Sequence, residues 1–296
     1  MFELNSDARA IVAAHQDKAI PVAGTPALNF SCEDAAYRSA KQAALALGFV
    51  EIDAECVARA WQAQVQRSGR FDPLAWPDEP ADFGLRPWPR REAFPACPKA
   101  LGVYAVLPSA EWVGRMARAG VPTVQLRFKS DDAAAVRREV QAAVDAVRGT
   151  AALLFINDHW REAIAAGAYG VHLGQEDMEI ADFTAIRAAG LRLGLSSHGY
   201  AEMVRADNLS PSYLAMGAVY PTTLKRMATA PQGPGRLAAY ARLMRHYPGV
   251  AIGGISAAEL PAIKATGVGS LAVVRAITGE ADPEQAAARL MAAWAA

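Results

Sequence analysis

The segment from Ala151 to Asp177 reads AALLFIND (151–158), HWREAIAAGA (159–168) and YGVHLGQED (169–177). Two short apolar runs each end in a polar cluster with an aspartate, Asp158 and Asp177, and a helix-length stretch separates them. This order predicts a strand–helix–strand unit in which the two strands run parallel. Parallel strands end on one face of a barrel, so both carboxylates are expected where α/β barrels hold their active sites. Two carboxylates there can hold Mg²⁺, which usually binds together with a substrate phosphate.

The sequence that follows and precedes this segment repeats the same pattern. From Ala100 onward, short apolar runs alternate with amphipathic stretches, and these runs qualify as strands: Gly102–Leu107, Thr123–Arg127, Ala152–Asn157, Gly170–Leu173, Arg192–Ser196, Tyr213–Ala218, Val250–Gly253 and Ser270–Val274. Eight strand–helix units predict an α/β protein with a (β/α)8 TIM barrel over residues 100–296. The alternative is an open doubly wound sheet, which favours a Gly-x-Gly-x-x-Gly turn after its first strand, and that turn is absent from this sequence.

Residues 1–68 have a helical pattern instead, with candidates at Ala8–His15, Ser31–Leu47 and Asp53–Gln66, the last with Asp53 as a candidate N-cap. Three short helices bury little surface alone, so this small extension is expected to lean on the larger domain or on a partner chain. Residues 69–99 are rich in proline and include Trp76 and Trp88. They predict an extended linker whose tryptophans pack on the neighbouring domain; the alternative is a proline-rich ligand for another protein.

Composition restricts the class of protein and its partners. The chain has 296 residues, 52% of them hydrophobic and 20% charged, with a formal net charge of zero. This balance gives no overall attraction to nucleic acid or to an acidic membrane surface. No apolar run reaches the roughly 18 residues of a membrane span, and the N-terminus lacks the pattern of a signal peptide. The three dispersed cysteines suit a reducing compartment, so a cytoplasmic protein is expected, and a homo-oligomer is compatible with the sequence.

Polar side chains gather at the predicted strand ends, which share one face of the barrel. Moving along the chain, these residues are Gln125, Arg127, Lys129, Asn157, Asp158, Asp177, Ser196, Lys225 and Arg275, with Arg226 as a further candidate. Because the chain is neutral overall, this concentration of cations beside two carboxylates is informative. Cations and carboxylates together suit a diphosphate that carries Mg²⁺.

A second phosphate site is predicted beyond the seventh and eighth strands. Gly253 and Gly254 close the seventh strand, and glycine lets backbone N–H groups approach an anion closely. Arg275 follows the eighth strand, and barrels commonly bind phosphate at these two loops. One diphosphate site and one monophosphate site together predict two substrates.

Several residues near the predicted strand ends can also be explained without a role in binding or catalysis. Arg127 and Lys129 alternate on a strand, as surface charges do. Asp158 can be the N-cap of the helix that it precedes. His172 has no second histidine at metal-ligand spacing, so it is expected to pack or to orient a neighbour, and His198 stays open.

Seven motifs together resemble the thiamine phosphate synthase family. They are Gln-Leu-Arg-x-Lys (125–129), Ile-Asn-Asp (156–158), Gly-Val-His-Leu-Gly-Gln-Glu-Asp (170–177), Ser-x-His (196–198), Pro-Thr-x-x-Lys (221–225), Ile-Gly-Gly-Ile (252–255) and Val-Val-x-Ala-Ile (273–277). They stand in the family's order over about residues 101–296, and the octet at 170–177 is the most specific of them. Residues 1–98 show no resemblance to this family.

The resemblance implies that hydroxymethylpyrimidine diphosphate is coupled to a thiazole phosphate, which gives thiamine phosphate and pyrophosphate. It also implies roles for the matching residues. Asp158 and Asp177 would hold Mg²⁺. The pyrimidine diphosphate would be bound by Gln125, Arg127, Lys129, Asn157, Ser196 and Lys225, of which Arg127, Lys129, Ser196 and Lys225 would act in catalysis. The thiazole phosphate would be bound by Thr222, Thr223, Leu224, Gly254, Val274 and Arg275.

Two positions depart from the family pattern, and both lie on the thiazole side. Leu224 stands where the family has a threonine, and Arg275 stands where it has a serine. A guanidinium can still bind a phosphate through paired hydrogen bonds. Two other functions stay open: a related barrel that does not couple the rings, such as a thiazole tautomerase, and a non-catalytic sensor of a thiamine precursor that contacts a partner through residues 1–98.

Overall fold

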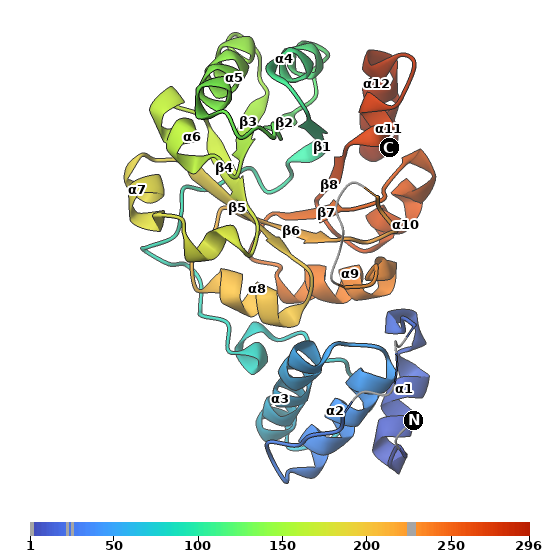
Figure 1. Ribbon diagram of the computed structural model, residues 1–296. Coiled ribbons are helices and arrows are strands. Elements are labelled where there is room, and N and C mark those ends of the chain that lie inside the picture. The colour runs from blue at the N-terminus through green and yellow to red at the C-terminus, as the bar shows by residue number, and fades with distance from the viewer. Residues whose placement is uncertain (1–2, 22–23, 25–26, 224–228) are drawn as a thin grey trace.

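The structure is a computed structural model that describes residues 3–21, 24, 27–223 and 229–296. Eight parallel strands close into a barrel in sequence order, and the first strand pairs with both the second and the eighth (Figure 1). The strands are β1 (Gly102–Leu107), β2 (Thr123–Leu126), β3 (Leu153–Asn157), β4 (Gly170–Leu173), β5 (Arg192–Ser197), β6 (Tyr213–Gly217), β7 (Gly249–Ile252) and β8 (Ser270–Val273). The predicted TIM barrel is confirmed, and each predicted strand boundary lies within one residue of the observed one.

Helices follow the strands and cover the outside of the barrel (Figure 1). They are α4 (Ala110–Arg118), α5 (Ala133–Ala146), α6 (Trp160–Ala166), α7 (Phe183–Ala188), α8 (Tyr200–Asp207), α9 (Gly233–Leu243), α10 (Leu260–Ala265), α11 (Arg275–Thr278) and α12 (Pro283–Ala295), with short 3₁₀ turns at η3 (Asp177–Glu179) and η4 (Ala257–Glu259). Within the described ranges, no helix has the length and apolar character needed to cross a membrane.

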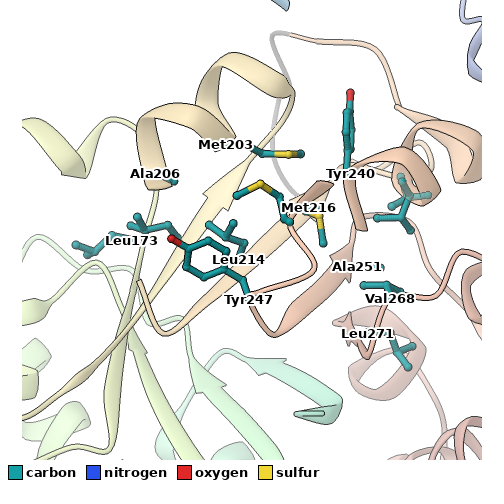
Figure 2. Packing of buried hydrophobic residues seen from close by; sticks show 14 of the residues in the cluster. Leu173, Met203, Ala206, Leu214, Met216, Tyr240, Tyr247, Ala251, Val268 and Leu271 are labelled. Atoms are coloured by element: carbon teal, nitrogen blue, oxygen red, sulfur yellow. The ribbon is translucent and has the colours of Figure 1, made fainter. Parts of the chain in front are cut away.

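The alternation of side chains along each strand separates two hydrophobic layers. In β1, Tyr104 and Val106 join the cluster inside the barrel, while Val103, Ala105 and Leu107 join the larger cluster under the helices. Figure 2 shows part of the outer layer, where side chains of α8 such as Met203 lie in one cluster with side chains of β6 such as Met216. Strands and helices are therefore held by apolar burial on both faces of the sheet.

Aromatic rings fill the inside of the barrel. The ring of Tyr213 lies 5.0 Å from that of Phe155 and 5.9 Å from that of Tyr104, measured between centroids. On the neighbouring strand, a Cβ at Gly194 would lie 2.1 Å from the Cζ atom of Tyr213. Only glycine leaves room for that ring, so Gly194 sets where the phenol of Tyr213 lies.

The chain before the barrel forms α1 (Ser6–Ala14), η1 (Gln16–Lys18), α2 (Ala35–Ala46), α3 (Glu51–Ser68) and η2 (Pro80–Phe83). We call α1 to α3 the helical extension. Figure 1 shows it as a separate layer of helices beside α8 and α9, on the outside of the barrel. The expectation that it leans on the larger domain is confirmed, because α3 contacts α8 and η1 contacts α9.

Two predicted details of the extension are wrong. The second helix begins at Ala35 rather than at Ser31, because the side chain of Asp34 caps it by accepting a hydrogen bond from the Tyr37 amide. The third helix begins at Glu51, so Asp53 lies in its first turn and is not its N-cap. The Asp53 carboxylate instead reaches a barrel helix, where its Oδ1 accepts a hydrogen bond from the Ala201 amide at 2.9 Å.

The proline-rich segment runs along the barrel surface, as the linker interpretation predicts. The indole Nε1 of Trp76 donates a hydrogen bond to the Tyr200 hydroxyl at 2.9 Å. The ring of Trp88 packs edge-on against Tyr247 at 5.1 Å between centroids. Arg90 forms a fully buried ion pair with Asp207 at the end of α8, at 2.8 Å. These contacts dock the segment, which argues against a free ligand for another protein.

Candidate active site

Two amides stand inside the mouth of the barrel on neighbouring strands. Gln125 on β2 and Asn157 at the end of β3 are both buried, and the Gln125 Nε2 donates a hydrogen bond to the Asn157 Oδ1 at 3.0 Å. The bond fixes the orientation of both groups and leaves the Gln125 carbonyl and the Asn157 amino group for a ligand. These are two of the residues that the sequence assigned to the pyrimidine diphosphate.

Asp158 follows directly after β3 in a conformation that is rare outside glycine, with φ at 63°. Its amide donates to the His172 carbonyl at 3.0 Å, which holds the backbone in this turn. Its carboxylate lies 2.5 Å from the Lys129 ammonium. The alternative role as a helix N-cap is wrong, because α6 begins at Trp160 and its N-cap residue is His159.

Asp177 opens the turn η3 after β4, and its Oδ2 accepts a hydrogen bond from the Gly174 amide at 2.9 Å. The pKa of Asp177 is raised, first by burial and then by the nearby Asp158 carboxylate, while the Gly174 amide and Lys129 act in the opposite direction. The two aspartates therefore come together, as the strand ends predict, and they repel each other. In the described part of the chain, no group of three or more His, Cys, Asp or Glu side chains is placed to hold a metal ion.

Ser196 on β5 is held by hydrogen bonds at its side chain and at its backbone. Its hydroxyl lies 2.8 Å from the Nε2 of His172, and its carbonyl accepts a hydrogen bond from the Gln175 side chain at 2.7 Å. The Nδ1 of His172 lies 2.7 Å from the Tyr213 hydroxyl, which in turn lies 2.8 Å from the Tyr104 hydroxyl. His172 therefore orients a neighbour, as the sequence predicts.

Tyr104, Tyr213, His172 and Ser196 thus form a chain of hydrogen bonds from the barrel core to the rim. The sequence pointed only to His172 and Ser196. Burial raises the pKa of Tyr213 well above its ordinary value, and the neighbouring Tyr104 adds to the effect. Both phenols thus stay protonated and keep their hydrogen bonds. Gly194 opposite the Tyr213 ring was the available signal for this arrangement, since a glycine inside a strand marks a close approach.

The predicted cations differ in how exposed they are, and two of them lie outside the described residues. Arg127 follows β2, half-buried, and its amide donates to the Leu107 carbonyl at 2.8 Å. Arg275 is exposed at the first position of α11. Leu224, Lys225 and Arg226 lie outside the described residues. The Nδ1 of His198, whose role the sequence left open, lies 2.7 Å from the Glu202 carboxylate.

The loops after β6 and β7 meet at the two glycines. Gly253 and Gly254 have φ values of 102° and 65°, and a Cβ at Gly254 would lie 2.5 Å from the Pro221 carbonyl oxygen. Both the backbone conformation and the available space thus require glycine here. Thr222 and Thr223 follow Pro221 on the same loop, half-buried and exposed respectively. Val274 is the N-cap residue of the short helix α11.

This chain is similar to known thiamine-phosphate synthases. The family model described as thiamine monophosphate synthase matches residues 103–277. Thiamine-phosphate synthase of Neisseria meningitidis serogroup B is 54% identical over 201 residues, which cover 68% of this chain and 98% of that protein. Thiamine-phosphate synthase of Salmonella typhimurium is 52% identical over 199 residues, which cover 67% of this chain and 94% of that protein.

A solved structure is similar over the same part of the chain. Thiamine phosphate pyrophosphorylase from Pyrococcus furiosus superposes with a TM-score of 0.57 and 27% identity, covering 66% of this chain and 96% of that one. The family match begins in β1 and ends in α11, so it includes the acid pair, the amide pair and Ser196. The helical extension lies outside the matched residues.

Proposed function

This chain belongs to the thiamine monophosphate synthase family of transferases, and we propose that it couples hydroxymethylpyrimidine diphosphate to a thiazole phosphate, forming thiamine phosphate and pyrophosphate. The observation that carries the proposal is the carboxylate pair Asp158 and Asp177 beside Lys129, on the rim that also holds Ser196. Both substrates are phosphorylated and do not cross a bilayer unaided, which supports the cytoplasm as its compartment.

The acid pair suits Mg²⁺. Asp177 lies close enough to Asp158 for their repulsion to raise the Asp177 pKa, and a cation between the two would relieve that repulsion. Mg²⁺ is commonly bound by one or two carboxylates, with water and substrate phosphate oxygens filling the other positions. A site with two protein carboxylates therefore fits a metal that arrives with a diphosphate. When bound, Mg²⁺ would offset negative charge on the departing pyrophosphate.

The pyrimidine diphosphate is assigned to the strand ends β2 to β5 and to Lys225. Arg127, Lys129 and Lys225 supply positive charge to the diphosphate, and Lys129 reaches it from beside Asp158. The amides of Gln125 and Asn157 are held to each other and so present fixed donors and acceptors. The Ser196 hydroxyl is oriented through His172 toward the same ligand.

The proposed reaction needs charge stabilisation and positioning, with no nucleophilic side chain. The bond between the methylene carbon of the pyrimidine and the diphosphate oxygen breaks, and its electron pair leaves with pyrophosphate. The lone pair of the thiazole nitrogen then forms the new carbon–nitrogen bond. The cations of the rim stabilise the leaving group, and the buried amides hold the pyrimidine while water is excluded.

The thiazole phosphate is assigned to the loops after β6, β7 and β8. The assigned residues are Thr222, Thr223, Leu224, Gly254, Val274 and Arg275. Gly254 brings backbone against the loop after β6. Arg275 is exposed and follows β8, the strand that pairs with β7. A guanidinium can bind phosphate oxygens in pairs, so Arg275 can replace the serine of the family pattern.

A barrel that does not couple the rings, such as a thiazole tautomerase, has no need of a diphosphate site. The acid pair, the amide pair and more than half identity to named thiamine-phosphate synthases favour coupling over that alternative and over a sensor.

The test is turnover by the full chain. Purified protein with both substrates and Mg²⁺ is expected to release pyrophosphate and to form thiamine phosphate, identified by mass spectrometry. Reactions that lack either substrate or the metal are the controls. A folded protein that forms no thiamine phosphate under these conditions refutes the proposed function.

A further inference from the structure

The helical extension contacts α8, the helix that follows the strand carrying Ser196. We propose that the extension positions the loop between β5 and α8, with Asp53 as the positioning residue, and so sets the affinity of the site for the pyrimidine diphosphate. The proposal rests on the proposed function, because it is Ser196 that links this loop to that substrate.

Asp53 supplies a cap that α8 lacks. The residue at the N-cap position of α8 is Gly199, which has no side-chain oxygen, and no side-chain cap bond comes from it. Asp53 is buried in the interface, and its Oδ1 accepts a hydrogen bond from the Ala201 amide in the first turn at 2.9 Å. The first amides of a helix need such acceptors, and a cap in a buried interface replaces water that has been excluded. The extension thus completes a helix of the barrel.

The residues around this cap are closely packed. A Cβ at Gly199 would lie 1.9 Å from the Asp53 Oδ2, so the backbone of the loop rests directly on the carboxylate. The next residue, Tyr200, is fully buried, and its hydroxyl accepts a hydrogen bond from Trp76 at 2.9 Å. Its ring stacks on Phe83 at 5.0 Å between centroids. Residues 199–201 are therefore held by the extension and by the proline-rich segment at once.

Anchored residues connect this clamp to Ser196. The Ser197 hydroxyl donates to the Ala215 carbonyl at 3.1 Å, and the His198 amide donates to the Glu202 carboxylate at 2.7 Å. Ser196 itself is held at its carbonyl by Gln175. Only four residues separate Ser196 from Ala201 along the chain. Few backbone torsions are therefore free to absorb a shift of the start of α8. Loss of the cap is thus expected to move or loosen the serine.

A second anchor keeps the extension in place on the next helix. Arg236 of α9 is buried, and it donates to the carbonyls of Lys18 and Leu47, each at 2.9 Å. Its guanidinium lies 3.6 Å from the Phe49 ring centroid. A Cβ at Gly235 would lie 1.9 Å from the Asp17 carbonyl oxygen. Two consecutive barrel helices therefore fix the extension, which makes it a rigid brace and not a tethered module.

The experiment compares three variants of the full chain. Asp53→Ala removes the acceptor, and Asp53→Asn keeps one acceptor oxygen while it removes the charge. The matched control is Asp34→Ala, which removes an aspartate cap of the same kind from α2, inside the extension. Hydrogen exchange of the segment 196–206 is measured by mass spectrometry, and the KM of each substrate is measured separately.

Asp53→Ala is expected to speed exchange in 196–206 and to raise the KM of the pyrimidine diphosphate about three- to tenfold, the effect of one lost cap. The KM of the thiazole phosphate is expected to change less than about twofold, since its residues lie on other loops. Asp53→Asn should restore most of both properties. Asp34→Ala should lower the melting temperature and leave both KM values near those of the unaltered chain. If Asp53→Ala does not fold, Asp53→Ser, which keeps a shorter acceptor, takes its place with a smaller shift in the same direction.

Folded Asp53→Ala or Asp53→Ser with unaltered exchange and unaltered KM values overturns the proposal. An equal rise in both KM values, or the same rise in Asp34→Ala, also overturns it, because general destabilisation then explains the effect. If the unaltered chain forms no thiamine phosphate, the proposed function fails, and the exchange of 196–206 still decides whether the brace exists.

Discussion

Asp177 on the barrel rim and Asp53 at the extension interface are two aspartates whose pKa is raised by burial, and they differ in the groups that contact their carboxylates. Asp53 meets mainly donors: the Ala201 amide, Arg236 and the Tyr200 amide lower its pKa, while the charge of Glu202 adds to burial in raising it. Asp177 has the Gly174 amide, but its close neighbour is a second carboxylate, Asp158. The fold thus surrounds Asp53 mainly with hydrogen-bond donors, and it places Asp177 next to another carboxylate.

We infer from this difference that Asp53 stabilises the fold, whereas Asp177 is kept for the ligand of the proposed reaction. A folded chain gains stability when a buried carboxylate meets donors, and it loses stability when two carboxylates share a site. Where such a conflict persists at a strand end of a barrel, function is the usual reason for it. Substitutions at the rim should therefore lower turnover directly, whereas substitutions at the interface should lower stability and change the site only through the position of Ser196.

The largest effect is expected from Asp177→Ala. Loss of one member of the acid pair should lower turnover about 100-fold or more, as for other groups that stabilise charge in a transition state. The melting temperature should stay unchanged or rise, because the repulsion from Asp158 disappears. Pyrophosphate release and thermal unfolding measure the two quantities. Full activity in this variant would show that Asp177 is a structural acid like Asp53.

Arg236→Ala tests the other region. The change removes hydrogen bonds to the carbonyls of Lys18 and Leu47 from a buried interface, so the free energy of unfolding should fall by about 2–4 kcal/mol. The control is Arg115→Ala, which breaks an ion pair with Glu284 on the barrel surface and should lower the free energy of unfolding far less. Both values come from denaturant unfolding. Equal losses in the two variants would show that the interface contributes no more than an ordinary surface.

Tyr213→Phe is expected to have a smaller effect than these two changes, and it tests whether a core residue supports the rim. The phenol lies in the core but supports His172, which orients Ser196, so its loss should lower kcat about tenfold while the fold persists. Tyr104→Phe, one hydrogen bond further from the rim, should have a weaker effect. Steady-state kinetics with both substrates checks the series. A larger loss in Tyr104→Phe than in Tyr213→Phe would contradict the direction of this support.

The barrel was largely predictable from local pattern. Buried parallel strands read as short apolar runs, and each run that fits this pattern became a strand with ends within one residue of the prediction. The polar clusters Asn157–Asp158 and Gln175–Asp177 likewise followed from where the runs stop. Helix starts were less accurate, because caps such as Asp34 depend on one side chain rather than on a repeated pattern.

The local pattern of the sequence was sufficient to predict the eight strands and the residues at their ends, since the period of apolar side chains reflects local backbone geometry. The contacts of the folded chain determine which of those groups repel each other and which are held by hydrogen bonds. They also determine which barrel helices the extension contacts. The bond from Asp53 to Ala201 joins residues 148 positions apart, and the bond between Tyr104 and Tyr213 spans 109 positions. Such contacts leave no local period in the chain, because they form only when the closed barrel and its covering helices bring distant segments together.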